Sequence, residues 1–213
     1  MKKILLTGVN GQVGHALQKK LSTHQVFALN REQLDLSDKE AIRRVVQTIQ
    51  PDLIINPAAY TAVDKAESEP DLAYAINATA PQILAEEAAK LGAALIHFST
   101  DYVYDGSKIA DYVETDSVNP LSVYGKSKLA GEEAIRATGI PHLILRTSWV
   151  YGAYGKNFLK TIIRLAAERD SLRIVADQFG APTSSESIAN AVVELLAAWQ
   201  PQDNNQTGVY HFT

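Results

Sequence analysis

The sequence predicts an α/β protein in which a doubly wound parallel sheet is covered by helices on both faces. Short apolar runs alternate with longer segments of helical periodicity along almost the whole chain. The runs are continuously apolar, which is typical of parallel strands buried on both faces. A glycine-rich turn joins the first apolar run to the first helical segment. Together these observations indicate alternating strand and helix units with right-handed crossovers.

Apolar runs such as KILLT and HLILRT mark the strands, which we expect at residues 3–7, 26–29, 52–56, 94–99, 142–147 and 208–212. Apolar residues spaced three or four apart mark the helices, which we expect at residues 12–21, 38–50, 71–91, 122–137, 157–168 and 185–199. Start and stop signals support these bounds. Ser37 is the expected N-cap of the second helix, and Pro51 ends it. Gly92 and Gly139 mark the ends of the third and fourth helices.

Composition narrows the class of protein. The chain has 213 residues, of which 46% are hydrophobic and 21% charged, as in an ordinary globular protein. It contains no cysteine, so disulfides and thiolate metal sites are excluded. The net charge is −4, and acidic and basic residues are interspersed along the chain, which argues against a nucleic-acid partner. No apolar run is long enough to cross a membrane, and we expect a cytoplasmic protein.

The turn after the first strand reads TGVNGQVG and predicts a dinucleotide site on a Rossmann-type sheet. Gly8 allows a sharp turn, Gly11 lets the backbone approach a pyrophosphate, and Gly14 lets the helix pack closely. The N–H groups that begin the following helix favour bound phosphate. We therefore expect the cofactor to contact this turn at Gly8, Asn10, Gly11, Gln12 and Val13.

The segment after the second strand is where a Rossmann domain meets the adenosine ribose of its cofactor. An acidic residue there favours NADH, whereas an arginine accommodates the 2′-phosphate of NADPH. This chain has Asn30 and Arg31, which favour NADPH without excluding NADH. Asp35 and Leu36 follow shortly after, and Asp35 is expected at the adenine edge.

A candidate catalytic group follows the fourth strand. Thr100 comes at its end, and Tyr124 and Lys128 lie four residues apart on the next predicted helix, so they share one face. A tyrosine can donate the proton that a reduced carbonyl needs, and a nearby lysine should draw its pKa down from about 10. Thr100 can orient the substrate oxygen. Tyr104 and Lys108 have the same spacing but lie in a turn-rich loop, where that spacing does not bring side chains together.

Five segments resemble the dTDP-4-dehydrorhamnose reductases of the extended short-chain dehydrogenase/reductase family. They are NPAAYTAVDKAESEP, STDYVYDG, NPLSVYGKSKLAGE, RTSWVYG and DQFGAPT. The resemblance covers nearly the whole chain. It implies reduction of the C4 keto group of dTDP-4-dehydro-6-deoxy-L-mannose to dTDP-L-rhamnose, a donor of bacterial cell-wall sugar, with NADPH or NADH as cofactor.

The resemblance also implies roles for individual residues, with Thr100, Tyr124 and Lys128 as its catalytic triad. The segment after the third strand implies cofactor contacts at Ala58, Ala59 and Tyr60 and sugar contacts at Thr61 and Val63. Further sugar contacts are implied at Thr100, Asp101, Tyr102 and Trp149. Glu186 matches a position that contributes, in some members, to a Mg²⁺ site between subunits of a homodimer, although a lone Glu at a helix start is more often a dipole partner.

Members of the family continue for several elements beyond the last strand found here. We therefore expect a small, truncated substrate-binding lobe beside an essentially whole cofactor site. The expected organisation is a Rossmann domain at residues 1–149, part of the lobe at 150–183 and a return to the Rossmann domain at 184–213.

Other functions stay open at this point. A nucleotide-sugar 4,6-dehydratase typically has Glu after Thr-Asp, where this chain has Tyr102. A 4-epimerase uses the same Tyr and Lys but retains its cofactor. A non-catalytic, NADP-binding regulatory subunit like that of methionine adenosyltransferase would have the same fold. The five histidines show no paired metal-ligand spacing, and His97 and His142 are interpreted as core histidines.

Overall fold

A computed structural model describes residues 1–201 and 206–213 and confirms the α/β fold. Six parallel strands form one sheet in the order β2-β1-β3-β4-β5-β8. The strands are β1 (Lys3–Leu6), β2 (Gln25–Ala28), β3 (Leu53–Asn56), β4 (Ala94–Thr100), β5 (His142–Thr147) and β8 (Gly208–His211). Each agrees with an expected strand to within one residue at either end.

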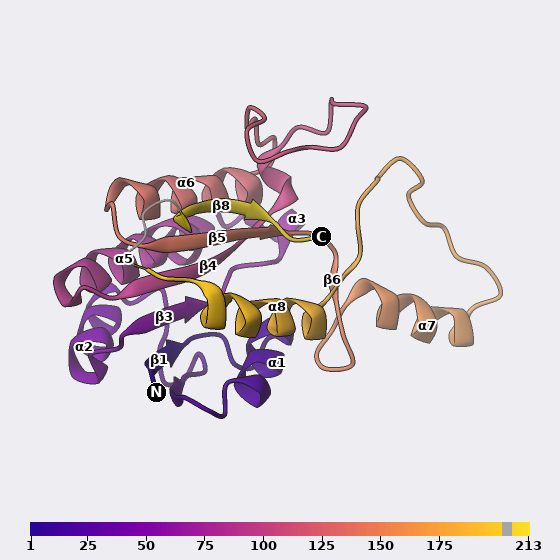
Figure 1. Ribbon diagram of the computed structural model, residues 1–213. Coiled ribbons are helices and arrows are strands. Elements are labelled where there is room, and N and C mark those ends of the chain that lie inside the picture. Colours follow the sequence, from indigo (N-terminus) through magenta and orange to yellow (C-terminus); the bar gives the residue numbers. More distant parts are fainter. Residues whose placement is uncertain (202–205) are drawn as a thin grey trace.

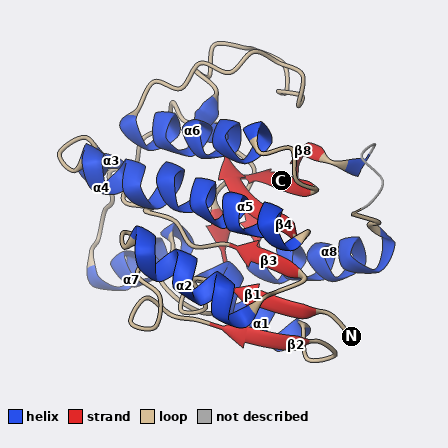
Figure 2. Cartoon of the chain, turned by 90° about the vertical axis from the view of Figure 1, so that its left-hand side faces the viewer, coloured by secondary structure: helices blue, strands red, loops and turns tan. Residues whose placement is uncertain are grey.

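Helices cover both faces of this sheet, which makes it a doubly wound, Rossmann-type sheet (Figure 2). One layer packs α1 (Gln12–Lys20) against α8 (Ser185–Ala198). The other layer, which faces the viewer in Figure 2, packs α2 (Lys39–Ile49), α5 (Ala80–Leu91) and α6 (Val123–Ala137) side by side. The chain runs from β1 to β2 and then returns past β1 to β3, so the winding reverses between β1 and β3. Such a reversal opens a crevice at the carboxyl ends of the strands.

The strands are mostly apolar because their side chains contribute to cores on both faces of the sheet. Ile4 and Leu6 point to the side of α1 and α8, where they pack with Leu17. Leu5, between them, points to the opposite side and packs with Ile42 of α2. All of these side chains are fully buried, as expected for a sheet that is covered twice.

A buried ion-pair network joins α2 to α5. The Glu87 carboxylate accepts hydrogen bonds from Arg43 (2.7 Å), Gln47 (3.0 Å) and Lys90 (2.6 Å). Burial alone would raise the pKa of Glu87, but these hydrogen bonds outweigh it and lower the pKa to about 2. The carboxylate is therefore charged in the folded protein at all ordinary pH values.

The expected cap of the second helix is wrong by one residue. Asp38, not Ser37, is the N-cap, and its carboxylate accepts the N–H of Ala41 at 3.0 Å. Ser37 instead donates its backbone N–H and its hydroxyl to Asp35, at 2.9 and 2.8 Å. The Ser37 hydroxyl and the Asp38 carboxylate could both accept a free N–H of the first helical turn. Asp38 is nearer the helix and takes the cap position.

The single helix expected at residues 71–91 is also a simplification. It begins as α4 (Pro70–Tyr74), passes through a π-helical segment (Ala75–Thr79) and continues as α5. The π segment contains the buried Asn77, whose side chain bonds both backbone groups of Tyr60 (2.8 and 3.1 Å) and the hydroxyl of Ser127 (3.0 Å). The extra residue of the π-helical turn occurs where Asn77 links this helix to α6 and to the segment after β3.

Two segments project from the layered body (Figure 1). One is the polar loop at residues 104–120, which follows a short 3₁₀ turn (Asp101–Val103). The other runs from β6 (Val150–Tyr151) through α7 (Phe158–Glu168) to β7 (Thr183–Ser184), and β6 and β7 pair in parallel. We call this second segment, residues 150–184, the β6–β7 lobe. None of the residues of α7 is buried.

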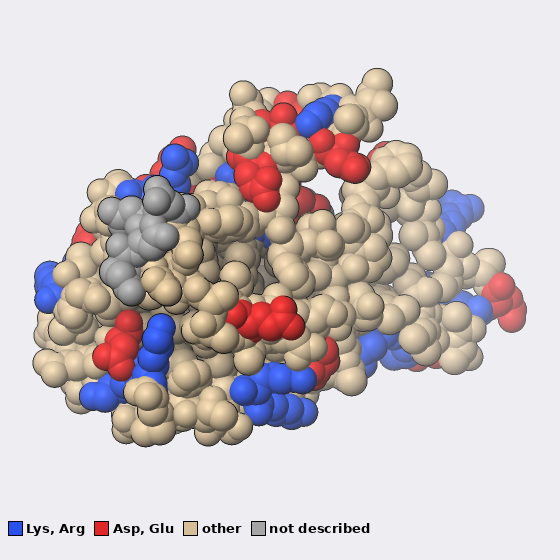
Figure 3. Space-filling view, in the orientation of Figure 1, with Lys and Arg blue, Asp and Glu red and all other residues tan. Residues whose placement is uncertain are grey.

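Charges of both signs are spread over the face shown in Figure 3, and several carboxylates lie on the projecting loop at its top. This agrees with the mixed charge pattern of the sequence. In the part of the chain that the structure describes, every helix is too short or too polar to span a lipid bilayer.

Candidate active site

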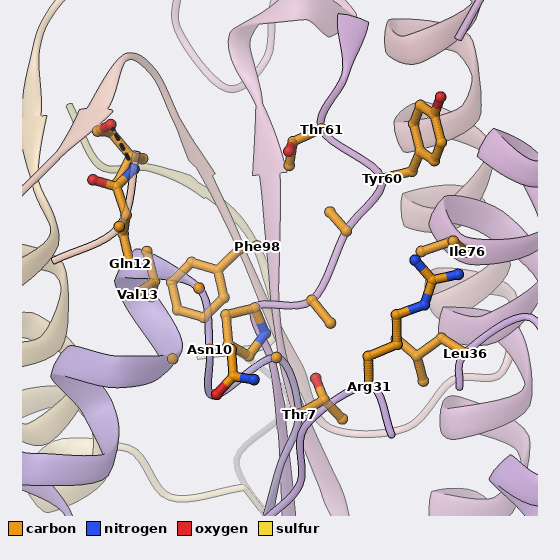
Figure 4. Close-up of a pocket in the computed structure, with 18 of the residues that line it drawn as sticks. Thr7, Asn10, Gln12, Val13, Arg31, Leu36, Tyr60, Thr61, Ile76 and Phe98 are labelled. Atoms are coloured by element: carbon orange, nitrogen blue, oxygen red, sulfur yellow. Dashed lines mark hydrogen bonds between the residues drawn. The ribbon is translucent and has the colours of Figure 1, made fainter. Parts of the chain in front are cut away.

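A cavity of about 650 Å³ lies at the carboxyl edge of the sheet, beside the reversal between β1 and β3. Its volume suits a cofactor-sized ligand. Fifteen of the residues singled out in the sequence line it: Gly8, Asn10, Gly11, Gln12, Val13, Gly14, Arg31, Asp35, Leu36, Ala58, Ala59, Tyr60, Thr61, Tyr124 and Lys128. Figure 4 shows the glycine-turn residues on one side and Arg31, Leu36 and Tyr60 on the other. The fold thus brings segments more than a hundred residues apart to one cavity.

The glycine turn is shaped by contacts that a side chain would block. Gly8 has a φ of +60°, and a Cβ there would lie 2.9 Å from Ala58. A Cβ on Gly14 would overlap the carbonyl of Gly8, so this glycine lets α1 start tight against the turn. Gly11 donates its N–H to the Gly8 carbonyl at 2.9 Å. The turn requires glycine at both its bend and its helix contact.

The first turn of α1 is open to an anion. Its N-cap is Gly11, no side chain caps the helix, and its first turn carries no acidic residue. The helix N-terminus therefore presents free N–H groups and a partial positive charge to the cavity. The Gln12 side chain points away toward the β6–β7 lobe, where it bonds the Val150 carbonyl at 3.0 Å and Asn157 at 2.9 Å.

The lobe also reaches the cavity directly. Val150, Gly155 and Lys156 line it. Tyr154 stacks on the ring of His15 in α1, with 3.7 Å between centroids and 8° between planes. The lobe therefore rests on the start of α1 and closes one side of the cavity.

Arg31 and Asp35 stand at the opposite end and form a 3.8 Å ion pair. Hydrogen bonds from Ser37, with a smaller contribution from Arg31, lower the pKa of the Asp35 carboxyl. Asn30 lies outside the lining. Its side-chain oxygen accepts the backbone N–H of Gln33, and the side-chain oxygen of Gln33 accepts the backbone N–H of Asn30, both at 3.0 Å. Asn30 thus shapes the loop that presents Arg31.

Ala58, Ala59 and Tyr60 follow β3 and run along the cavity. The Tyr60 hydroxyl donates to Glu69 at 2.7 Å, and its backbone is held by Asn77. Thr61 lines the cavity, while Val63 begins the short helix α3 (Val63–Ala66) outside the lining. The wall beside β3 is therefore built from backbone that the π segment fixes.

Tyr124 and Lys128 lie one turn apart on α6, whose N-cap Ser122 accepts the Gly125 N–H at 3.1 Å. The Lys128 ammonium is buried; it donates to the Phe98 carbonyl at 2.7 Å and lies 3.2 Å from Nε2 of His97. Burial lowers the pKa of Lys128 to about 8, against an opposing effect of Glu132. Tyr104 and Lys108 do not converge in this way, because Tyr104 bonds Arg146 and Lys108 pairs with Asp116.

The tyrosine does not follow the expected direction. Burial raises the pKa of Tyr124 to about 12, and the nearby Thr100 hydroxyl only partly offsets the rise. The expected lowering by Lys128 is wrong for this structure, because the Lys128 ammonium is directed to Phe98 and His97. A phenol that stays protonated is nevertheless the form a proton donor needs.

Thr100, Asp101 and Tyr102 lie just beyond the lining, at the end of β4. The Thr100 hydroxyl donates to Asp101 at 3.0 Å and accepts the Tyr102 N–H at 3.2 Å, so its orientation is held from both sides. Burial raises the pKa of the Asp101 carboxyl. The ring of Tyr102 meets that of Tyr124 edge-on at 5.6 Å.

Trp149 and Glu186 lie away from the cavity. Trp149 has a φ of +43°, rests over Gly180 and lies 6.3 Å from the ring of Phe158. Glu186 forms a 3.6 Å ion pair with Lys20. Within the described residues no group of three or more His, Asp or Glu side chains could hold a metal ion, so nothing in the structure supports Mg²⁺ at Glu186.

Several lining residues carry no sequence signal that we used. Thr7, Phe98 and Ser99 end or follow strands, and their position at the carboxyl edge could have identified them. Pro57 follows β3 and Thr147 ends β5, so both share that signal, whereas the others reach the cavity only through tertiary packing: Leu34, Ala62, Lys65, Ile76, Val150, Gly155 and Lys156.

Known proteins share this sequence and this fold. The dTDP-4-dehydrorhamnose reductase of Burkholderia thailandensis is 47% identical over 215 residues, covering 99% of this chain and 72% of that protein. Its counterpart in Escherichia coli K12 is 45% identical over 213 residues, covering 98% and 71%. The structure of the Bacillus anthracis dTDP-4-dehydrorhamnose reductase in complex with NADP matches with a TM-score of 0.92 at 38% identity, covering 100% of this chain and 75% of that one.

A family model described as the RmlD substrate binding domain matches residues 1–213. The match spans the residues that line the cavity, helix α6 and the β6–β7 lobe alike. Sequence, structure and family model agree along the whole chain, and the chain belongs to the dTDP-4-dehydrorhamnose reductase family.

Proposed function

We propose that this protein is an NAD(P)H-dependent reductase of the C4 keto group of dTDP-4-dehydro-6-deoxy-L-mannose, forming dTDP-L-rhamnose. One observation carries the proposal: Tyr124 and Lys128 reach the same cavity as the glycine turn. A proton donor and a dinucleotide cradle are the two things that reduction of a carbonyl requires. The named activities of the relatives in Burkholderia thailandensis and Escherichia coli support the same reaction.

The cavity fits a nicotinamide dinucleotide. Its diphosphate would meet the uncapped start of α1 and the bend at Gly8 and Gly11. Ala58, Ala59 and Tyr60 would lie along its length, and Lys128 would hold the nicotinamide ribose. When bound, the cofactor supplies the hydride that reduces the carbonyl carbon.

The side chains of this protein supply the proton. Tyr124 donates its phenolic proton to the oxygen that becomes the C4 hydroxyl. Thr100, held between Asp101 and the Tyr102 N–H, aligns that oxygen. The buried setting of Lys128 strengthens its electrostatic effect on the reacting atoms.

The β6–β7 lobe is proposed as the sugar-nucleotide side, within an organisation of Rossmann domain at 1–149 and 184–213 and partial substrate lobe at 150–183. It contacts the cavity through Val150, Gly155 and Lys156, which supports this division. The proposed sugar contacts are Thr61, Val63, Thr100, Asp101, Tyr102 and Trp149. The left-handed backbone of Trp149 costs about 1–2 kcal/mol, and strain of this kind is common at ligand sites.

We also propose a preference for NADPH over NADH. Arg31 lines the cavity, and its only described ion-pair partner, Asp35, is partly exposed, so a 2′-phosphate can take its place. Arg31→Ala should raise the Kd for NADPH about tenfold, because a charged hydrogen bond is lost, and leave that for NADH nearly unchanged. Fluorescence titration with both cofactors measures this. An equal loss for the two would contradict the assignment of Arg31.

The reaction itself is tested by NADPH oxidation at about 340 nm, using enzymatically made dTDP-4-dehydro-6-deoxy-L-mannose. We expect turnover that Tyr124→Phe reduces by about 10²-fold or more, with NADPH binding retained. NADPH binding without turnover would favour a non-catalytic, regulatory role, whereas retention of tightly bound cofactor through catalysis would favour an epimerase. A homodimer stays a prediction that light scattering can check.

A further inference from the structure

His97 is a buried titratable group for which the mechanism above has no use. It lies in the middle strand β4, has no exposed surface, and its ring sits directly beneath the catalytic helix α6. Burial and the nearby Lys128 both lower the pKa of His97, so the imidazole is neutral. A neutral imidazole has one N–H donor and one acceptor nitrogen.

The ring forms the centre of a hydrogen-bonded chain across three strands and a helix. His97 Nε2 lies 3.2 Å from Nζ of Lys128. His97 Nδ1 lies 3.1 Å from the side-chain amide of Asn56, its register partner on β3. The same amide lies 2.6 Å from Oγ1 of Thr7, which ends β1 and lines the cavity. All four residues are buried.

The chemistry of the chain fixes the protons. An ammonium group can only donate, so Nε2 of His97 must be the acceptor and Nδ1 must carry the proton. In the structure the Asn56 amide faces Nδ1 of His97 with its Nδ2 (3.1 Å) and accepts the Thr7 hydroxyl with its Oδ1 (2.6 Å), so a proton on Nδ1 requires this amide to turn by about 180° and present its oxygen to the ring. The two orientations of an amide fill the same space, so the network chooses between them.

We propose that His97 is a positioning residue for Lys128: its Nε2 accepts one ammonium proton, the Phe98 carbonyl accepts a second, and the third is thereby directed to the cavity. The inference rests on the proposed role of Lys128. With three donors and two of them held from below, the ammonium has one direction left for a ribose hydroxyl or the reacting centre.

The charges around Lys128 are compatible with this arrangement. On α6 it is flanked by Tyr124 and Glu132, one turn away on either side. Glu132 is occupied by a 2.6 Å ion pair with Arg146 from β5 and by the Ser99 hydroxyl from β4. Below it lies His97. Glu132 raises the pKa of Lys128 but is engaged elsewhere, so the neutral ring and a carbonyl are its bonded acceptors.

The first test does not require activity. In protein labelled with ¹⁵N-histidine, the His97 resonances are those missing from His97→Gln. We expect an Nδ1–H tautomer that does not titrate between about pH 6 and about pH 8, with an Nε2 shift that moves in Lys128→Met. An Nε2–H tautomer, or an Nε2 signal unchanged in Lys128→Met, would overturn the proposal whether or not the protein turns over.

The second test uses kinetics. His97→Leu removes the acceptor and should lower kcat by about tenfold and move the alkaline limb of the pH–rate profile to lower pH, because the ammonium loses a hydrogen bond to its charged form. His97→Gln keeps an acceptor oxygen and should retain most of the rate. His142→Gln, on the neighbouring strand and bonded only to Ile140 among the described residues, is the matched control for loss of a buried histidine. Equal effects of His97→Leu and His142→Gln would contradict a positioning role.

Discussion

The side-chain nitrogen of Gln12 donates a 3.0 Å hydrogen bond to the backbone carbonyl of Val150, although the two residues are 138 apart in sequence. The oxygen of the same side chain accepts a bond from Asn157 at 2.9 Å. One residue of the glycine-turn helix therefore anchors both the first strand and the helix cap of the β6–β7 lobe. The position of the lobe over the cavity depends on this side chain.

Gln12→Ala should loosen the lobe without unfolding the sheet. Two hydrogen bonds are lost, each worth about 1 kcal/mol, so amide exchange at residues 150–157 should quicken about tenfold or more. Hydrogen exchange followed by mass spectrometry measures this. Gln18→Ala, on the exposed side of the same helix, is the control. Unchanged exchange at 150–157 would show that the lobe is held by other contacts.

The rate of reduction should fall on the alkaline side of about pH 8. Burial lowers the pKa of Lys128 to about 8, so its ammonium form is present below that pH and is lost as pH rises through it. Tyr124 keeps its proton to about 12 and does not limit the rate in this range. We expect kcat/KM to be level near neutrality and to drop about tenfold per pH unit above the limb. A pH–rate profile that stays level to about pH 10 would show that the charge on Lys128 has no role in the rate of reduction.

Gly8 and Gly139 form a matched pair of substitutions. Both have left-handed backbones, with φ of +60° and +71°, so an alanine at either should cost about 1–2 kcal/mol of stability. A Cβ at Gly139 meets open space, whereas one at Gly8 lies 2.9 Å from Ala58 at the cavity wall. Gly8→Ala alone should weaken NADPH binding, by about tenfold or more. Calorimetric titration with NADPH measures this. Comparable affinities of the two variants would show that the shape of the turn has no role in cofactor binding.

Glu87→Gln should destabilise the protein by about 3 kcal/mol near neutral pH, at about 1.4 kcal/mol per pKa unit. The hydrogen bonds to Glu87 lower its pKa from 4.5 to about 2. Their contribution is complete above the unfolded pKa and is lost as pH falls through about 2. Urea unfolding from about pH 7 to about pH 3 should show the deficit of the variant shrinking with acid. Glu86→Gln removes a more exposed partner of Arg43 and should cost much less. A deficit that is independent of pH would rule out the ionised carboxylate as its source.

The sheet could be predicted because its signal is local. The run Leu53-Ile54-Ile55 is continuously apolar, which is typical of a strand that is covered on both faces. The break at Ala75–Thr79 could not be predicted, since Asn77 bends the helix through partners on two other segments. An asparagine within an alanine-rich helix looks like any other weak helix former until those partners are known.

The residues of the site likewise fall into those that the sequence predicts and those that only the fold brings to the cavity. Gly8 and Thr100 adjoin the ends of strands, where the sequence itself indicates the carboxyl edge. Lys156 reaches the cavity from the β6–β7 lobe, which Gln12 contacts through Val150. His97 was interpreted as a core histidine, and it is buried, but its contact with Lys128 joins β4 to a helix 31 residues further along. The pattern of a strand indicates which residues are buried, but it does not show which polar groups a buried side chain contacts.

The two strands that pair with β5 are synthesised at different times. β4 precedes β5, while β8 pairs with Leu143–Arg146 only after the β6–β7 lobe and α8 have been traversed. During synthesis the first five strands can therefore assemble on the ribosome before their last neighbour emerges. The β5 edge stays unpaired for that interval, and closing it across so long a separation is a slow, non-local step. Helix α6, which precedes β5, is therefore synthesised before this edge is paired, whereas the β6–β7 lobe, which lines part of the cavity, is synthesised between β5 and β8.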